Sequence, residues 1–114
     1  ETPLPKKLNG KPDLSIAREA WWMPIKLIED YRRTAPVQVA LEMRVFGGTH
    51  VTLAPENGND FTLGIEILSN DTVADDVWQD FCQTVHAAWF DRWPGTRLHL
   101  AKQWDKLKSP NTKG

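Results

Sequence analysis

The chain has 114 residues, enough for one small domain, and its 14 basic and 15 acidic side chains leave a formal net charge of -1. A chain so close to neutral lacks the positive surface of a dedicated nucleic-acid-binding protein. No apolar run is long enough to span a bilayer, and the single cysteine, Cys82, excludes a disulfide within the chain. Its six tryptophans are an unusually large share, and we expect most of them in the core.

Residues 1–15, ETPLPKKLNGKPDLS, contain several prolines and a glycine but show no hydrophobic period, so we expect an extended linker or loop. Residues 108–114, at the other end, have a similar composition and are expected to form a tail. Loop-like sequence at both ends favours a piece of a longer protein, with residues 16–107 as the folded segment.

A first helix is expected from about Pro24, because proline is well tolerated in the first turn of a helix. Its apolar face is expected to contain Pro24, Leu27, Ile28 and Tyr31. Pro36 marks the point beyond which this helix cannot continue. Trp21 and Trp22, just before the helix, are interpreted as core anchors rather than as a platform for a substrate.

Residues 37–46 alternate as in a β-strand, and Gly47-Gly48 closes the strand. One face is apolar: Val39, Leu41, Met43 and Val45. Glu42 and Arg44 share the other face. A solvated outer face explains two such charges, but an arginine held beside a carboxylate is also a common way to orient an anionic or hydroxylated group. The residues alone leave both interpretations open.

A second strand is expected over residues 60–69, after a turn in which Asn57-Gly58 favours positive φ. One face of this strand carries apolar side chains: Phe61, Leu63, Ile65 and Ile67. The turn predicts antiparallel pairing with an earlier segment, first of all with residues 50–54.

Residues 73–92 form the most strongly predicted helix, with Thr72 and Asp75 spaced as in a capping box. Its buried stripe is expected to contain Trp78, Cys82, Val85 and Trp89, so the cysteine is interpreted as an unreactive core thiol. His86 is placed on the flank of the helix. Residues 96–101 can then return as a short strand, and residues 102–107 as a helical turn.

The expected fold class is therefore α+β, with a mainly antiparallel sheet covered by two helices. His99 and Lys102, near the end of the last strand, could accept a proton and stabilise charge, although their spacing is also that of ordinary surface residues. The histidines and the cysteine show no metal-ligand spacing, so no metal site is predicted.

Three pieces of the sequence, LEMRV, VTLAPENGNDFTLGIEI and TRLHLAKQW, occur in an order that resembles the C-terminal part of the vanillyl-alcohol-oxidase-like flavoproteins. Within them, the resemblance is to aldonolactone and alditol oxidases and to flavin-linked (type II) cholesterol oxidases. Those enzymes carry Glu-x-Arg on a strand of the substrate domain, which Glu42-Met43-Arg44 matches. Sugar-oxidising members follow it with a Leu-Ser-Pro-like segment, and Leu53-Ala54-Pro55 stands in the matching place.

Near their C-terminus these enzymes have an Arg-Pro-His-Trp-Gly-Lys stretch, in which Arg97, His99 and Lys102 match. Three positions here depart from it: Leu98, Leu100 and Ala101. Ile65 and Ile67 stand where the sugar oxidases place His and Thr, which implies a less polar substrate than a polyol. The likeness covers residues 37–107 and implies a segment of a larger substrate domain.

The resemblance implies an FAD-dependent oxidase that moves hydride from an alcohol CH–OH group, in a sterol, polyol or sugar lactone, to the flavin and then electrons to dioxygen. Arg44 would contact the flavin and stabilise negative charge, Glu42 would hold that guanidinium, and Lys102 would position or deprotonate the hydroxyl. Ile65, Ile67 and His99 would contact the substrate. The partner implied is an N-terminal FAD-binding domain or chain, without which this segment is inactive.

A second interpretation is a stand-alone, non-catalytic binding module with a tryptophan-rich core. It predicts a stable, colourless protein that recognises a partner or an apolar ligand without redox chemistry. No nucleophile–base pair is visible, which disfavours a hydrolase.

Overall fold

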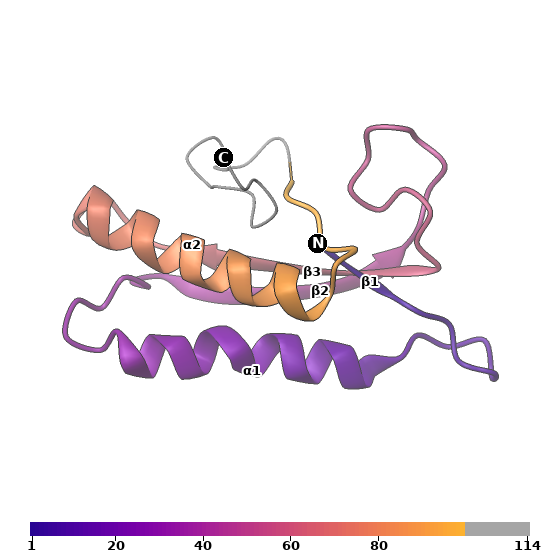
Figure 1. Cartoon of the computed structure of the whole chain (residues 1–114), viewed down its shortest axis with the longest axis horizontal. Coiled ribbons are helices and arrows are strands. Elements are labelled where there is room, and N and C mark those ends of the chain that lie inside the picture. Colours follow the sequence, from indigo (N-terminus) through magenta and orange to yellow (C-terminus); the bar gives the residue numbers. More distant parts are fainter. Residues whose placement is uncertain (100–114) are drawn as a thin grey trace.

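A computed structural model describes residues 1–99, which contain three strands and two helices (Figure 1). In chain order these are β1 (Thr2–Leu4), α1 (Leu14–Asp30), β2 (Ala40–Gly47), β3 (Phe61–Leu68) and α2 (Asp75–Arg92). The strands form one antiparallel sheet in the order β1-β3-β2. The predicted α+β class, with a mainly antiparallel sheet and two helices, is confirmed.

β3 is the central strand, and its register decides which side chains share a face. Leu63 lies opposite Thr2 of β1 and opposite Val45 of β2. The core on this side of the sheet contains five buried hydrophobic residues: Leu4, Ala17, Ala20, Leu63 and Trp93. Phe61 and Ile65, at alternate positions from Leu63, pack against this core. The apolar face of β3 is therefore the core face, as its alternation predicts.

The expectation of an extended linker or loop over residues 1–15 holds for residues 5–13 and is wrong at both ends, where β1 and the start of α1 lie. Thr2–Leu4 pairs with β3 as an outer strand, and Leu4 is fully buried. α1 then begins at Leu14, where the side chain of Asp13 caps the helix by accepting a hydrogen bond of 3.1 Å from the amide of Ser15. The sequence misleads in this segment because Pro3 lies within the strand and Pro5 directly after it, and the strand is too short to show a period.

Pro24 does not start α1 but lies buried in its middle. Proline has no amide to bond to the carbonyl four residues earlier, so it leaves the oxygen of Ala20 without its helical partner. The indole Nε1 of Trp89 donates to that oxygen at 2.9 Å. Because Ala20 is itself only 1% exposed, this bond from α2 satisfies a group that water cannot reach.

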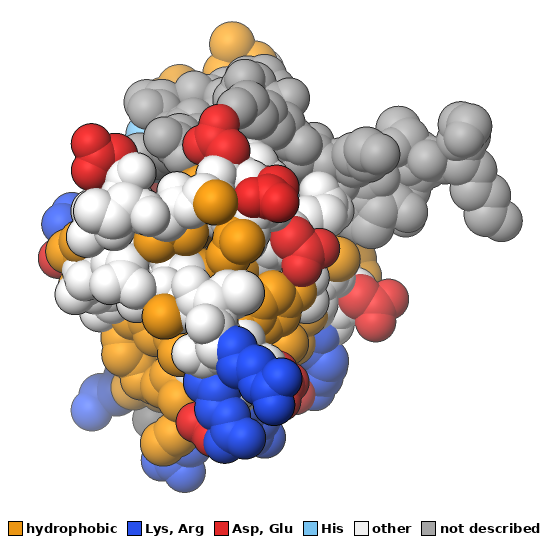
Figure 2. Space-filling model, turned by 90° about the vertical axis from the view of Figure 1, so that its left-hand side faces the viewer, with side chains coloured by type: hydrophobic (Ala, Val, Ile, Leu, Met, Phe, Trp, Pro, Cys, Tyr) orange, Lys and Arg blue, Asp and Glu red, His pale blue; other side chains and the backbone are white. Residues whose placement is uncertain are grey.

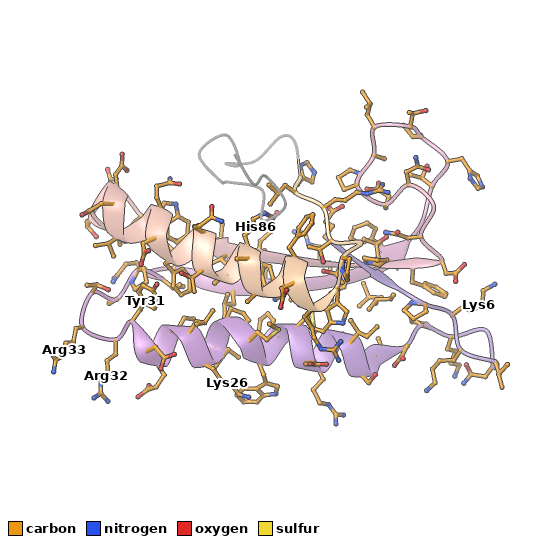
Figure 3. The ribbon with its side chains drawn as sticks, viewed as in Figure 1. Lys6, Lys26, Tyr31, Arg32, Arg33 and His86 are labelled. Atoms are coloured by element: carbon orange, nitrogen blue, oxygen red, sulfur yellow. The ribbon has the colours of Figure 1, made fainter. Side chains whose placement is uncertain are left out.

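The ends of the two helices are tied by Tyr31, which lies just after α1 and points toward α2 (Figure 3). Its hydroxyl donates to Asp80 Oδ2 at 2.7 Å and lies 3.0 Å from Thr84 Oγ1. Its ring meets that of Phe81 edge-on, with 5.3 Å between the centroids. The helices thus contact each other through the Trp89 bond near the middle of α1 and the Tyr31 cluster at its end. An exposed ion pair between Arg92 of α2 and Glu19 of α1, 2.9 Å long, adds a third contact.

Of the residues predicted for the buried stripe of α2, Val85 is buried, together with Phe81, which is expected alongside the stripe; His86 is also buried. Trp78, Cys82 and Trp89 are only partly buried. His86 is 5% exposed rather than on the flank, its ring packs against Phe90, and burial lowers its pKa. The capping box is also wrong, since Ala74 is the N-cap and Thr72 instead donates to Asn70.

Two tryptophans lie in α1 rather than before it, and one of them does not serve the core. Trp22 is 52% exposed, whereas Trp93 is 8% exposed and belongs to the core cluster. The interpretation of Trp22 as a core anchor is therefore wrong. The expectation that tryptophans lie in the core is confirmed for Trp93. Trp104 lies outside the described residues.

Residues 50–54 do not form the first partner of β3, which pairs directly with β2 and β1. The connection between β2 and β3 is instead a folded loop, in which Gly58 has the positive φ (+79°) expected of the Asn57-Gly58 turn. The carbonyl of Thr49 accepts the amide of Gly58 at 3.0 Å. Gly48 is required here, because a Cβ on it would lie 1.7 Å from the oxygen of Asn59.

Charges at one end of the molecule complement the helix dipoles. Asp75 and Asp76 lie in the first turn of α2, while the exposed Arg32 and Arg33 follow the end of α1. In the view onto this end, acidic and basic side chains gather on separate sides with hydrophobic atoms between them (Figure 2). Each charge stabilises its helix end by a few tenths to about 1 kcal/mol.

Substitution of Leu4 tests whether the first residues belong to the fold. Because Leu4 is fully buried, Leu4→Ala should lower the free energy of unfolding by about 2–5 kcal/mol in urea denaturation. Leu8→Ala is the matched control: Leu8 is fully exposed in the following turn, and its loss should change stability by less than about 0.5 kcal/mol. Equal effects of the two substitutions would restore the linker interpretation.

The hydrogen bond from Trp89 that replaces the missing amide of Pro24 can be tested with a double-mutant cycle. Trp89→Phe should lower the free energy of unfolding by about 1–3 kcal/mol more than the loss of ring volume alone, because the Ala20 oxygen is left buried and unpaired. In a Pro24→Ala background the amide of residue 24 can bond this oxygen, so Trp89→Phe should cost about 1 kcal/mol less. The same cost of Trp89→Phe in both backgrounds, measured by urea denaturation, would contradict the assignment.

Candidate functional site

Glu42 and Arg44 lie on β2 and point to the face of the sheet opposite the core. Arg44 Nη2 is 3.8 Å from Glu42 Oε2. The Arg44 side chain is 76% exposed and the Glu42 side chain is 47% exposed. A contact this long between exposed groups contributes little to stability. The pair is therefore a pair of charges available to another molecule, rather than a structural ion pair.

The register of β2 on β3 brings two further residues to this face. Arg44 lies opposite Gly64, and Glu42 lies opposite Glu66. A Cβ at position 64 would lie 3.2 Å from the ring of Phe46, so the glycine lets this ring lie against the strand beside Arg44. The face thus combines a guanidinium, two carboxylates and one aromatic ring. The sequence does not single out Gly64 and Glu66, because only the β2–β3 register identifies them.

The two isoleucines expected to contact substrate lie on the other face. Ile65 is opposite Met43 and Ile67 is opposite Leu41, at positions that alternate with Glu42 and Arg44. Ile65 packs against the core cluster. The sheet therefore does not bring Ile65 and Ile67 together with the charged pair in one pocket. The β3 residues directly opposite Arg44 and Glu42 are Gly64 and Glu66.

The C-terminal motif can be followed as far as His99, which is exposed. Lys102, the expected catalytic lysine, lies outside the described residues, as do the end of the predicted strand 96–101 and the helical turn 102–107. Within the described part, Arg97 and Glu1 exchange two backbone hydrogen bonds of 2.7 Å, beside β1. Thr96 and Thr2 are joined by a buried hydroxyl–hydroxyl bond of 2.9 Å.

The guanidinium of Arg97 connects two of the motif segments. Its Nη1 donates to the carbonyl oxygens of Ala54 at 3.4 Å and Asn57 at 3.2 Å. Ala54 belongs to the Leu53-Ala54-Pro55 segment, 43 residues away along the chain. The resemblance matches Arg97 but implies no role for it; the structure makes it the residue that fixes the loop between β2 and β3.

Two hollows flank this loop and the start of the chain, and each has a volume of about 410 Å³. One is bordered by Lys6, His50 and Asp60, among others. The other lies between Pro3, Ile16 and Trp93. Neither is lined by Glu42 or Arg44, so within residues 1–99 the charged pair lies on an open surface and not in a cavity.

Other chemistry finds little support among the described residues. Burial raises the pKa of the Cys82 thiol to about 11, which keeps it protonated and unreactive at neutral pH. Residues 1–99 contain no group of three His, Cys, Asp or Glu side chains placed to hold a metal ion. In the same residues, neither helix has the length and apolar character needed to cross a bilayer.

Comparison of the chain with protein-family models, with curated proteins and with solved structures gives no significant match.

Proposed function

We propose that this chain is part of the substrate domain of an FAD-dependent alcohol oxidase, in which the face of β2 opposite the core lies toward the flavin. The observation that carries the proposal is the Glu42–Arg44 pair, exposed and 3.8 Å apart on that face. The contact between Arg97 and Ala54 adds support, because it joins two segments on which the resemblance to this family rests. The substrate class is a sterol, polyol or sugar lactone with an oxidisable CH–OH group.

The described residues fit one edge of a flavin but not the whole cofactor. Arg44 offers a guanidinium that is three-quarters exposed, and arginine remains charged at any physiological pH. The sequence has no glycine-rich loop to hold a diphosphate. The remaining contacts to FAD must therefore come from an FAD-binding domain or a partner chain.

FAD, when bound, would supply the hydride acceptor and the route of electrons to dioxygen. Arg44 stabilises negative charge at the reacting centre, because a fixed cation lowers the energy of a transition state in which charge develops. Glu42 keeps the guanidinium oriented along the strand. Lys102 would position or deprotonate the substrate hydroxyl, and His99 would contact the substrate.

The first test is an absorption spectrum of the natural protein that carries this chain, purified without denaturation. A flavin spectrum that bleaches when an alcohol is added without oxygen is expected, with sterols, polyols and aldonolactones as the first substrates. A colourless protein that releases no FAD on denaturation would contradict the proposal.

Arg44→Ala in that protein should leave bound FAD in place and slow anaerobic flavin reduction roughly 10²–10³-fold, the usual effect of removing one stabilising donor. Arg44→Lys should recover part of the rate, because the charge is kept. Arg32→Ala is the matched control, since Arg32 is 73% exposed and pairs with its helix neighbour Glu29. Wild-type reduction by the Arg44→Ala protein would exclude the role given to Arg44.

The alternative is an interaction module without redox chemistry. It is favoured by two hydrophobic side chains that β2 exposes on the face opposite to the charged pair, Met43 and Val45, which are 45% and 42% exposed. Such side chains on a strand surface are typical of contact sites for other proteins. A colourless protein that binds a partner through β2 would support this alternative.

A further inference from the structure

β2 is an outer strand of unusual accessibility. It has eight residues, and in the part of the chain that the structure describes it pairs only with β3. Its sequence, ALEMRVFG, contains neither proline nor lysine, two devices by which proteins prevent outer strands from pairing with other chains. The unpaired side of β2 is therefore a template for one more strand.

The core face of the sheet continues past its covering helices onto β2. Met43 is 45% exposed and Val45 42%, although both lie on the face that packs on the core at β1 and β3. Buried residues would be expected at such positions in a finished sheet. An additional strand beside β2 would bury the sides of these side chains against its own apolar side chains.

The order of side chains along β2 is complementary to itself. Met43 has Glu42 before it and Arg44 after it. One position further out, Leu41 and Val45 stand at equal distances from Met43. In an antiparallel pair of two such strands centred on Met43, each Glu42 lies directly opposite Arg44 of the other copy. Each Leu41 lies opposite Val45, and the two Met43 side chains meet on the axis.

We infer that β2 pairs with β2 of a second copy of this chain, antiparallel and centred on Met43, so that two three-stranded sheets join into one. Within one chain the Glu42–Arg44 contact is 3.8 Å long, because both residues project from the same strand. Across the pair, directly opposite charges can approach more closely, and the two-fold axis makes that contact twice.

Other centres lose this complementarity. Centring on Glu42 or on Arg44 would place two like charges directly opposite each other, which destabilises a strand pair. If the two-fold axis lay between two residues, the core face of one sheet would continue into the opposite face of the other sheet. Of the centres near the middle of β2, only Met43 places opposite charges across from each other and apolar side chains across from each other.

The inference does not depend on the proposed flavin chemistry, and a different measurement tests it. The oligomeric state of the 114-residue chain is read by sedimentation velocity over a range of concentrations. The wild-type chain should show a reversible dimer. Glu42→Arg and Arg44→Glu should each weaken the dimer about tenfold or more, because each turns two attractive pairs into two repulsive ones.

Mixing the two variants gives the decisive control. The Glu42→Arg chain then presents two arginines and the Arg44→Glu chain two glutamates, so every charge in the mixed pair again meets its opposite. The mixture should dimerise about as well as the wild type, which also shows that both variants are folded. Arg32→Glu, a charge reversal at an exposed site outside the sheet, should dimerise like the wild type.

The register is tested by cross-linking in a Cys82→Ser background. Opposite residues of an antiparallel pair have Cα atoms about 4.5–5.5 Å apart, within the range that a disulfide spans. Met43→Cys should therefore form a disulfide-linked dimer under mild oxidation, and Val45→Cys should not, because its counterpart lies four residues along the other strand.

A wild-type chain that remains monomeric at all concentrations overturns the inference, whether β2 is free or covered by a different partner. Variants that dimerise like the wild type, a mixture that fails to recover, or cross-linking at Val45→Cys in place of Met43→Cys also overturn it. A loss of flavin reduction without a change of dimerisation would concern the proposed function alone.

Discussion

The hydrogen bond from Trp89 to the oxygen of Ala20 joins the two helices at the point where α1 cannot complete its own bonding. Pro24 removes the amide that would normally serve this oxygen, and Ala20 is almost fully buried, so the partner has to come from another element. That partner sets the position of α2 along α1. With α2 placed, Trp93 at its end reaches the core beside Leu4 and Leu63.

The same placement brings the chain back to the sheet beyond α2. Trp93 is followed by Thr96 and Arg97, which bond to Thr2 and Glu1 along the outer side of β1. Arg97 then reaches across to the loop between β2 and β3 through the oxygens of Ala54 and Asn57. A local defect in α1 is thus linked, through α2, to the long loop of the sheet.

The elements that the sequence predicts well are those long enough to repeat a hydrophobic period several times. The strands around Val45 and Leu63 and the helix containing Val85 occur within a few residues of their predicted bounds. β1 cannot be predicted in this way, because three residues cannot show a period. It is stabilised by pairing with β3 rather than by its own composition. The expected start of α1 lies ten residues too late because Pro24 resembles a first-turn residue, and nothing local in the sequence shows that Trp89 replaces its missing bond.

For the candidate site, alternation within β2 is enough to place Glu42 and Arg44 on one face. The side chains that accompany them depend on pairing between strands that are separated by a loop. Alternation within β3 already places Ile65 on the apolar face, but only the register puts Gly64 and Glu66 beside the charged pair. The role of Arg97 in fixing the loop is a long-range contact of the same kind.

An exposed contact of 3.8 Å contributes too little to explain why β2 carries both charges on one face. A function of the two charges would depend on a group outside the described chain, and the two proposed partners make different demands on Arg44. A flavin or its substrate needs the guanidinium directed away from the sheet, whereas a second β2 strand needs it directed along the sheet toward Glu42 of the other copy. The backbone pairing of two β2 strands is compatible with both, but a single Arg44 side chain can serve only one of them at a time. If both proposals hold, binding at the face should compete with the charge pairs across the strands, and the dimer should weaken when the face is occupied.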